Sequence, residues 1–309
     1  MRFEEAYNGW TESRFTQEEA ARLLGITDRT FRRYLLKYEE EGLSGLIDKR
    51  LEQISHRRAP VDEVITLTTL YKGRYSGWNV KHFYSFYKNN HSGLRSYTWV
   101  KTALQKEGVV SKSTKRGAHR KKRERALLEG MMLHQDGSDH YWVPDERWDL
   151  IVTMDDATSE HYSMFFVEEE GTASSFQGVK ETIEKKGLFC SFYTDRGSHY
   201  WTTPEVGGKV DKNNLTQFGR AMRHLGIEMI PAYSPEARGR SERVFRTHQE
   251  RLPKELAMLG ITTMEEANEY LKNVYMPAYN SEFSVPAAVT GSAFVSWVNG
   301  SLDDVLKIS

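Results

Sequence analysis

The chain of 309 residues is 39% hydrophobic and 28% charged, which is typical of a folded protein with two or three domains and unlike disordered or fibrous chains. It contains no run of about 18 apolar residues, which excludes a helical membrane span. The first residues lack the apolar segment of a secretory signal, and the single cysteine, Cys190, excludes an internal disulfide. We therefore expect a cytoplasmic protein with no membrane partner.

The formal net charge of zero conceals a division between the two parts of the chain. Residues 1–125 contain 26 Lys and Arg against 15 Asp and Glu, whereas residues 126–309 contain 17 against 28. A basic part followed by an acidic part is the pattern expected when a module that binds a polyanion precedes a module that binds cations. Uneven surface charge without functional meaning is the alternative.

Residues 15–38 have the pattern of a helix-turn-helix, which we assign to a first DNA-binding domain over 1–55. Thr16 and Glu19 have the spacing of a capping box, and Gly25 precedes Thr27, which can cap a second helix. The basic side chains of this second helix are predicted to face outward, where they can contact phosphates and guanine edges. They are Arg29, Arg32, Arg33 and Lys37. An ordinary helical hairpin with a basic rim is the alternative.

Residues 56–110 predict a second helical domain that resembles a helix-turn-helix less clearly. Apolar residues at helical spacing indicate helices near 61–70, 78–87 and 97–107, the last of them capped by Ser96. Aromatic side chains are frequent here, and core packing explains them better than base stacking does.

A basic segment follows, which we assign to a linker over 111–127. Residues 111–125 contain eight Lys or Arg, one Glu and almost no apolar side chain, so the segment cannot bury surface. We expect it to lie along a phosphate backbone, with a solvated tether as the alternative. Its candidate DNA contacts are Lys115, Arg116, Arg120, Lys121, Lys122 and Arg123.

From residue 131 the pattern changes to strands, and we place an α/β core over 128–275, followed by a tail over 276–309. Strands are predicted at 131–143, 148–156, 161–170, 187–195 and 227–233, with helices at 172–186 and 215–225 and a further helix from Pro235 to Leu252. Three strands followed by alternating helices and strands predict a mixed five-stranded sheet with flanking helices. Ligands in such sheets bind near strand ends.

Three carboxylates stand at notable places in this pattern. Asp136 lies in the first strand, Asp195 at the end of the fourth, and Glu242 on the last helix. Only the fold can bring them together, and each has a plain alternative, a turn for either aspartate and an ion pair on the helix surface for the glutamate. Asp155 and Asp156 compete with Asp136, but their position in a hairpin bend favours a turn role.

The last predicted helix is also strongly basic. Glu242, Arg246 and Gln249 fall on one of its faces. Its arginines can hold phosphates beside a metal site without being ligands, although a surface ion pair explains each of them nearly as well. They are Arg238, Arg240, Arg243 and Arg246. His199 is a candidate for orienting a scissile phosphate, and a structural histidine is the alternative.

The segments HQDGS, TDRGSHYW and YSPEARGRSERVFRTHQERL resemble the three catalytic blocks of DDE transposases and retroviral-type integrases, and are most similar to those of ISNCY-type bacterial insertion-sequence transposases. The resemblance extends from TQEEAARLLGITDRTFRRYL through the basic linker to about Phe283. It implies an RNase H-like catalytic core whose catalytic and metal-binding acids are Asp136, Asp195 and Glu242. The implied cofactors are two divalent ions, Mg²⁺ with Mn²⁺ as a substitute, with Asp136 bridging the pair.

The same resemblance implies an insertion-sequence transposase that cleaves DNA at the element ends and joins them to target DNA. Its expected partners are duplex DNA, as terminal inverted repeats and target, and further copies of the chain, in a bacterial cytoplasm near the nucleoid. Members of the family typically continue into a β-rich module, so the chain looks shortened after its last residues, VSWVNGSLDDVLKIS. The alternative is therefore a truncated, catalytically incomplete regulator that binds element ends. An RNase H-like nuclease for RNA hybrids is disfavoured by the two DNA-reading domains.

Overall fold

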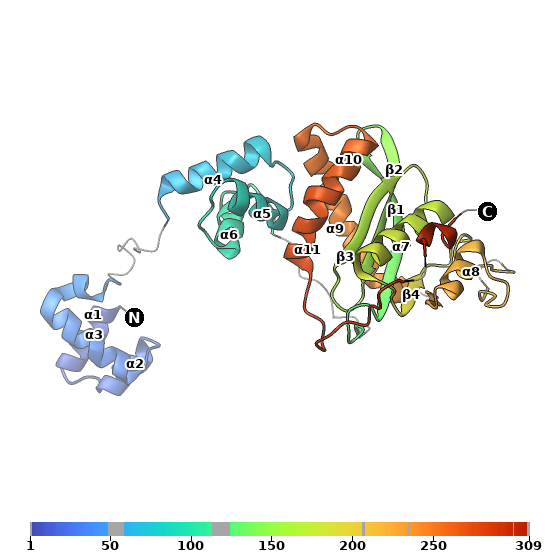
Figure 1. The fold of residues 1–309 in the computed structure, drawn as a ribbon. Coiled ribbons are helices and arrows are strands. Elements are labelled where there is room, and N and C mark those ends of the chain that lie inside the picture. Colours follow the sequence, from blue (N-terminus) through green and yellow to red (C-terminus); the bar gives the residue numbers. More distant parts are fainter. Residues whose placement is uncertain are drawn as a thin grey trace. The chain divides into compact units, whose positions relative to one another are not determined.

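The computed structural model divides the chain into two compact units, residues 1–66 and 67–309 (Figure 1). It describes residues 2–48, 59–112, 124–205, 208–233, 235–298 and 300–307. None of the helices in these ranges is both long and apolar enough to cross a membrane.

The first unit contains the predicted helix-turn-helix as α2 (Gln17–Leu23) and α3 (Asp28–Glu41). The capping box is confirmed, because the Thr16 hydroxyl accepts from the Glu19 amide and the Glu19 carboxylate accepts from the Thr16 amide. Thr27 caps α3 by accepting from the Thr30 amide. Local hydrogen bonding therefore sets the start of both helices.

A helix that the sequence pattern did not predict, α1 (Phe3–Thr11), completes the core of this unit. Phe3 packs its ring against Phe31, and the side chains of Ala20 and Leu35 are buried in the same cluster. The exposed face of α3 is thereby left for its polar and charged residues.

The second helical segment comprises α4 (Val61–Arg74), α5 (Val80–Asn90) and α6 (Tyr97–Lys106), and α4 crosses the boundary between the two units. Ser96 caps α6, as expected. The aromatic side chains of this segment form its core, which confirms that they are packing residues. The buried members are Tyr71, Tyr75, Trp78, Phe83 and Tyr87.

Among the described residues, five strands form one mixed sheet in the order β3-β2-β1-β4-β5. The strands are β1 (Met132–Val143), β2 (Glu146–Asp155), β3 (His161–Val167), β4 (Ser191–Thr194) and β5 (Glu228–Pro231). The pairs β1–β2 and β2–β3 are antiparallel, whereas β4 pairs with β1 and with β5 in parallel. This confirms the mixed five-stranded sheet of an RNase H-like core.

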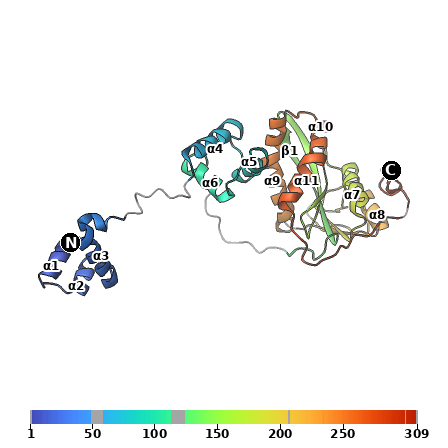
Figure 2. The ribbon, with the colours of Figure 1, turned by 60° about the vertical axis from the view of Figure 1, so that its left-hand side comes forward.

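Helices cover both faces of the sheet (Figure 2). The helices α7 (Thr172–Lys186) and α8 (Gln217–His224) pack on one face, around Phe176, Phe192 and Phe218. The other face is covered by α9 (Pro235–Leu259), α10 (Met264–Tyr270) and α11 (Met276–Phe283). Leu252 and Leu256 of α9 are fully buried there against side chains of β2 and β3.

The C-terminal half of α9 also contacts the second helical segment. His82 of α5 is 2.6 Å from the buried carboxylate of Glu255, and Ser85 donates to Glu282 of α11. Asn79 donates to Glu250 at 3.2 Å. One long helix therefore bears Glu242 near its beginning and packs against the preceding helices further along.

The C-terminal segment after α11 is packed along the core. The Val285 amide donates to the Thr158 carbonyl, and Val295 pairs with Leu188 in a short antiparallel bridge. Leu302 is buried in the cluster beneath α7 and α8. The tail therefore covers part of the sheet layer on the side away from α9.

Candidate active site and nucleic-acid interface

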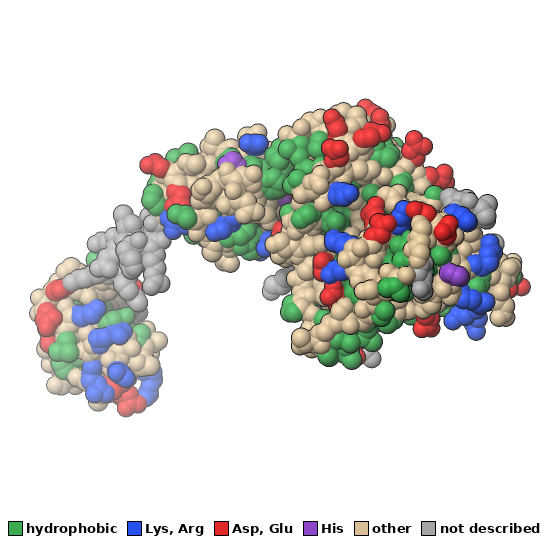
Figure 3. All heavy atoms as spheres, viewed as in Figure 1, with side chains coloured by type: hydrophobic (Ala, Val, Ile, Leu, Met, Phe, Trp, Pro, Cys, Tyr) green, Lys and Arg blue, Asp and Glu red, His purple; other side chains and the backbone are tan. Residues whose placement is uncertain are grey.

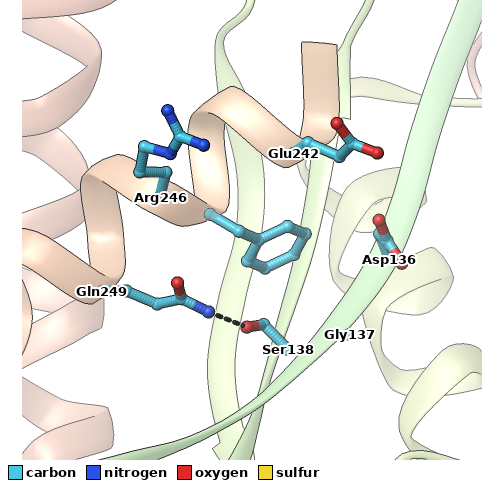
Figure 4. Close-up of a pocket in the computed structure, with 7 residues that line it drawn as sticks. Asp136, Gly137, Ser138, Glu242, Arg246 and Gln249 are labelled. Carbon is cyan, nitrogen blue, oxygen red and sulfur yellow. Dashed lines mark hydrogen bonds between the residues drawn. The ribbon is translucent and has the colours of Figure 1, made fainter. Parts of the chain in front are cut away.

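An open pocket of about 400 Å³ lies between β1 and α9 (Figure 4). Its lining combines consecutive residues of β1 with one face of α9: Asp136, Gly137, Ser138, Glu242, Phe245, Arg246 and Gln249. The helical spacing of the four lining residues on α9 places them on one face of the helix. The sequence predicted this common face for Glu242, Arg246 and Gln249.

The carboxylates of Asp136 and Glu242 enter the same space from opposite walls (Figure 4). Asp136 is largely buried, with 9% of its surface exposed, whereas Glu242 is exposed. At the other end of the pocket the Gln249 amide donates to the Ser138 hydroxyl at 2.9 Å, which ties α9 to β1. The fold therefore brings two of the three predicted acids to one pocket.

The third predicted acid, Asp195, directly follows β4, the parallel neighbour of β1. In the register of these strands His134 lies opposite Tyr193. Asp136 and Asp195 each come two residues later, so continuation of this register places them level with each other. Asp195 is not part of the pocket lining, and its Oδ1 accepts from the Gly197 amide at 2.8 Å.

No group of three His, Cys, Asp or Glu side chains within the described ranges is arranged closely enough to hold a metal ion. Two of the three predicted acids, Asp136 and Asp195, nevertheless act together with Glu170 on one buried residue. Burial raises the pKa of Tyr200 well above its usual value, and the negative charges of Glu170, Asp136 and Asp195 raise it further. The strand ends around Tyr200 therefore carry a concentrated negative potential.

Glu170 is an acid of this region that sequence reasoning did not select. A Cβ added at Gly137 would lie 2.3 Å from its Oε2 atom, so the carboxylate rests against the β1 backbone. His199 approaches the Glu170 carboxylate at 3.6 Å, and its ring packs at a tilt against Tyr200 with ring centres 3.9 Å apart. The run of three glutamates at the end of the third predicted strand was the available signal. The role of His199 in orienting phosphate stays a prediction.

The two aspartates of the hairpin bend have different roles. Asp155 is a turn residue, as expected, because its carboxylate accepts from the amides of Gly130 and Thr158. Asp156 is fully buried and contacts His134 at 2.6 Å and the guanidinium of Arg240. Arg240 was predicted to bind DNA, and the structure places its charge against Asp156 instead of leaving it directed at solvent.

The remaining predicted DNA contacts differ in how far the structure describes them. On α3, Arg29, Arg33 and Lys37 are exposed, and Arg32 is paired with Asp28. On α9, Arg243 and Arg246 are exposed. The side chain of Arg238 and the linker contacts lie outside the described residues, namely Lys115, Arg116, Arg120, Lys121, Lys122 and Arg123.

A basic surface that the sequence analysis did not single out lies on α8. Its Arg220 and Arg223 side chains are exposed, and Figure 3 shows Lys and Arg side chains gathered over this helix. The helix follows the Asp195 loop in the chain, so the positive charge lies on the segment that leaves the candidate site.

Comparison with known proteins gives matches in both units. Residues 7–60 match the winged helix-turn helix family. The putative transposase y4bF of Sinorhizobium fredii is 29% identical over 286 residues, which cover 90% of this chain and 60% of the relative. The transposase for insertion sequence IS1202 of Streptococcus pneumoniae is 25% identical over 303 residues, which cover 87% of this chain and 65% of the relative.

Two solved structures match at low similarity. A chain of the simian T-cell lymphotropic virus intasome in complex with PP2A regulatory subunit B56 gamma is 16% identical, with a TM-score of 0.40, over 67% of this chain and 68% of that one. The HTLV-2 integrase catalytic core domain in complex with magnesium is 16% identical, with a TM-score of 0.38, over 48% of this chain and 88% of that one.

The strand order and the preceding helix-turn-helix define a chain in which a helix-turn-helix domain precedes an RNase H-like core. The two transposase relatives, together with the winged helix-turn helix match, support the DDE transposase and integrase family for this chain. The chain spans less than two thirds of the length of either curated relative.

Proposed function

We propose that the chain is an insertion-sequence transposase that cleaves DNA at the ends of its element and joins them to target DNA. The observation that carries the proposal is the pocket in which Asp136 and Glu242 face each other, with Arg246 on the same helix face. The similarity to two transposases along most of the chain supports the same conclusion.

The acids of this region fit divalent metal ions by their chemistry. Carboxylate oxygens are the ligands that Mg²⁺ prefers, and we assign the ions to Asp136, Asp195 and Glu242. When bound, two Mg²⁺ ions, or Mn²⁺ as a substitute, would stabilise charge on the attacking and leaving oxygens of a phosphodiester. Because no three such groups are clustered in the described residues, the proposal requires the acidic side chains to converge when the ions bind.

The reaction consists of two displacements at phosphorus. In the first, a water oxygen bonds to phosphorus at the element end and the bond to the 3′ oxygen breaks; the water loses a proton and the 3′ oxygen gains one. In the second, the freed 3′-hydroxyl bonds to a target phosphorus and displaces the target's 3′ oxygen, with the same proton balance. Catalysis of such steps depends chiefly on positioning and charge neutralisation.

The chain's own residues supply the positioning. Arg246 lies on the pocket wall, where its exposed guanidinium can bind a phosphate oxygen through two hydrogen bonds. The hydrogen bond from Gln249 to Ser138 keeps α9 close to β1 and so limits the width of the pocket. The basic side chains exposed on α3 would hold the element end through contacts to its phosphates and to the edges of its nucleobases. Because two element ends must meet one target, we propose that the chain acts as a homo-oligomer on DNA.

The test is a strand-transfer assay with the full chain and DNA that carries the ends of the element encoding it, in Mg²⁺ or Mn²⁺. The proposal predicts cleaved ends and joined products, both lost in Asp195→Asn. If the chain binds the ends but makes no product, and Asp195→Asn behaves identically, the protein is an end-binding regulator and the proposal is wrong.

A further inference from the structure

Three separate segments of the chain meet on the carboxylate of Asp156. This residue lies in the bend between β2 and β3 and is fully buried. His134 Nε2 lies 2.6 Å from its Oδ1, which also contacts the guanidinium of Arg240. Its Oδ2 accepts from the Ala126 amide at 2.7 Å. The carboxylate therefore joins β1, α9 and the segment that leads into the core.

The partners of Asp156 are neighbours of the proposed metal ligands. His134 precedes Asp136 by two residues, and alternate residues of a strand lie on the same face. Arg240 precedes Glu242 by two residues on α9. The two elements that carry the facing acids are thus tied to one point close to the pocket, whereas Asp156 itself is not part of the pocket lining.

The charges of this group hold it together. Burial alone would raise the pKa of Asp156, but the hydrogen bond and charge of His134 and the charge of Arg240 keep this pKa well below its usual value. A buried carboxylate that remains ionised needs its cationic partners, because an unpaired charge is strongly disfavoured in the interior. Arg240 is consequently held at a fixed position, with only 18% of its side chain exposed.

The backbone around Asp156 is fixed in addition by Arg125. The Nη1 atom of Arg125 lies 3.0 Å from the carbonyl oxygens of both Asp156 and Ala157, and 2.8 Å from the Ser159 hydroxyl. Arg125 therefore holds the bend in place. Because the bend cannot move together with α9, a displacement of α9 would have to break the contact between Asp156 and Arg240.

We propose that Asp156 is a positioning residue for the acid pair: through Arg240 it fixes the first turns of α9 against β1, so that Glu242 faces Asp136. This inference rests on the proposed function, because the ion pair of Asp156 and Arg240 can position metal ligands only if Asp136 and Glu242 bind metal ions. Groups that orient metal ligands commonly affect metal affinity by 10- to 100-fold without contacting the ion.

The test measures Mn²⁺ binding by the full chain without DNA, by titration with detection of free Mn²⁺ by electron paramagnetic resonance. The variants are Arg240→Gln and Asp156→Asn, with Arg240→Lys as the conservative replacement. The control is Asp155→Asn, which alters an equally buried carboxylate whose hydrogen bonds go to Gly130 and Thr158. All melting temperatures are measured in parallel.

We expect Arg240→Gln and Asp156→Asn to weaken Mn²⁺ binding about 10- to 100-fold, and Arg240→Lys to restore most of the affinity. Asp155→Asn should lower the melting temperature but leave Mn²⁺ affinity within about twofold, because it does not displace α9. If Asp156→Asn fails to fold, the comparison of Arg240→Gln with Arg240→Lys decides, because Arg240 is partly exposed.

Mn²⁺ affinity equal to the wild type in folded Arg240→Gln would overturn the inference. The proposed function has a separate readout, because it requires Glu242→Gln to bind Mn²⁺ more weakly than the wild type does. If Glu242→Gln binds Mn²⁺ like the wild type, the metal site is wrong and the positioning role fails with it. If Glu242→Gln weakens binding and Arg240→Gln does not, only the positioning role is wrong.

Discussion

Asp136 and Asp195 each follow by two residues the last pair of the parallel strands β1 and β4, in which His134 lies opposite Tyr193. Glu242 faces Asp136 from α9 across the pocket. The sheet therefore supplies two acids of the proposed site, and the helix that packs on its face supplies the third.

The contact between Gly137 and Glu170 predicts a local effect of adding one methyl group. In Gly137→Ala the new Cβ would lie 2.3 Å from Glu170 Oε2, so the carboxylate or the strand must shift. Because Gly137 follows Asp136, we expect cleavage to slow by about 10- to 100-fold. Adding Glu170→Ala should restore most of the rate by removing the clash. The matched control is Gly73→Ala, where a Cβ meets no atom within 4 Å, and an unrescued double variant would contradict this explanation.

If α3 reads DNA as proposed, its arginines are expected to contribute unequally. Arg29 and Arg33 are exposed, whereas Arg32 is already paired with Asp28. Alanine at Arg29 or Arg33 should weaken binding to element-end DNA and reduce the slope of log affinity against log salt by about 1. Alanine at Arg32 should have a smaller effect, because its guanidinium charge is already engaged by Asp28. Equal losses at all three positions, measured by fluorescence anisotropy over a salt series, would show that the ion pair opens on DNA.

The buried pair of histidines formed by His161 of β3 and His248 of α9 predicts a loss of stability in acid. His161 and His248 contact each other at 3.0 Å, and His248 contacts the Tyr275 hydroxyl at 3.0 Å. Burial lowers the pKa of His161 from 6.5 to about 4, so the unfolded chain binds more protons than the folded one between these values. Stability should therefore be fully present above pH 6.5 and fall by about 2 kcal/mol by pH 5.

The measurement is the melting temperature between pH 7.5 and 5. Relative to its own melting temperature at pH 7.5, His161→Gln should lose less than the wild type as the pH falls, because the imidazole of His161 is no longer there to titrate. His224→Gln, which replaces an exposed histidine of α8, should follow the wild-type curve. A decrease of the same slope in His161→Gln would assign the acid sensitivity to other groups.

Features set by local rules were predictable from the sequence. The capping box of Thr16 and Glu19 and the cap of Ser96 gave the starts of two helices, because both depend on residues three positions apart. The helical spacing of Glu242, Arg246 and Gln249 likewise gave their common face. Such features need no knowledge of tertiary structure.

Features that depend on contacts between distant segments were not predictable. The corresponding positions of Asp136 and Asp195, two residues beyond the last β1–β4 pair, follow from the strand register, which no local pattern encodes. The role of Asp156 depends on three partners from three segments, so its sequence context indicated only a turn. Predicted strands also ended late, since β4 stops at Thr194, the last residue that pairs with the short strand β5. Strand ends, strand register and the contacts of Asp156 therefore depend on tertiary partners, which composition and periodicity do not reveal.

The most direct test of the account is cleavage of element-end DNA in Mn²⁺ by the wild type and by Asp136→Asn, Asp195→Asn and Glu242→Gln, with binding to the same DNA measured in parallel. The account predicts that each single substitution abolishes cleavage and joining, by at least about 10²-fold, while the DNA affinity and the circular dichroism spectrum remain those of the wild type. Strand joining at the wild-type rate in any one of the three variants would contradict it.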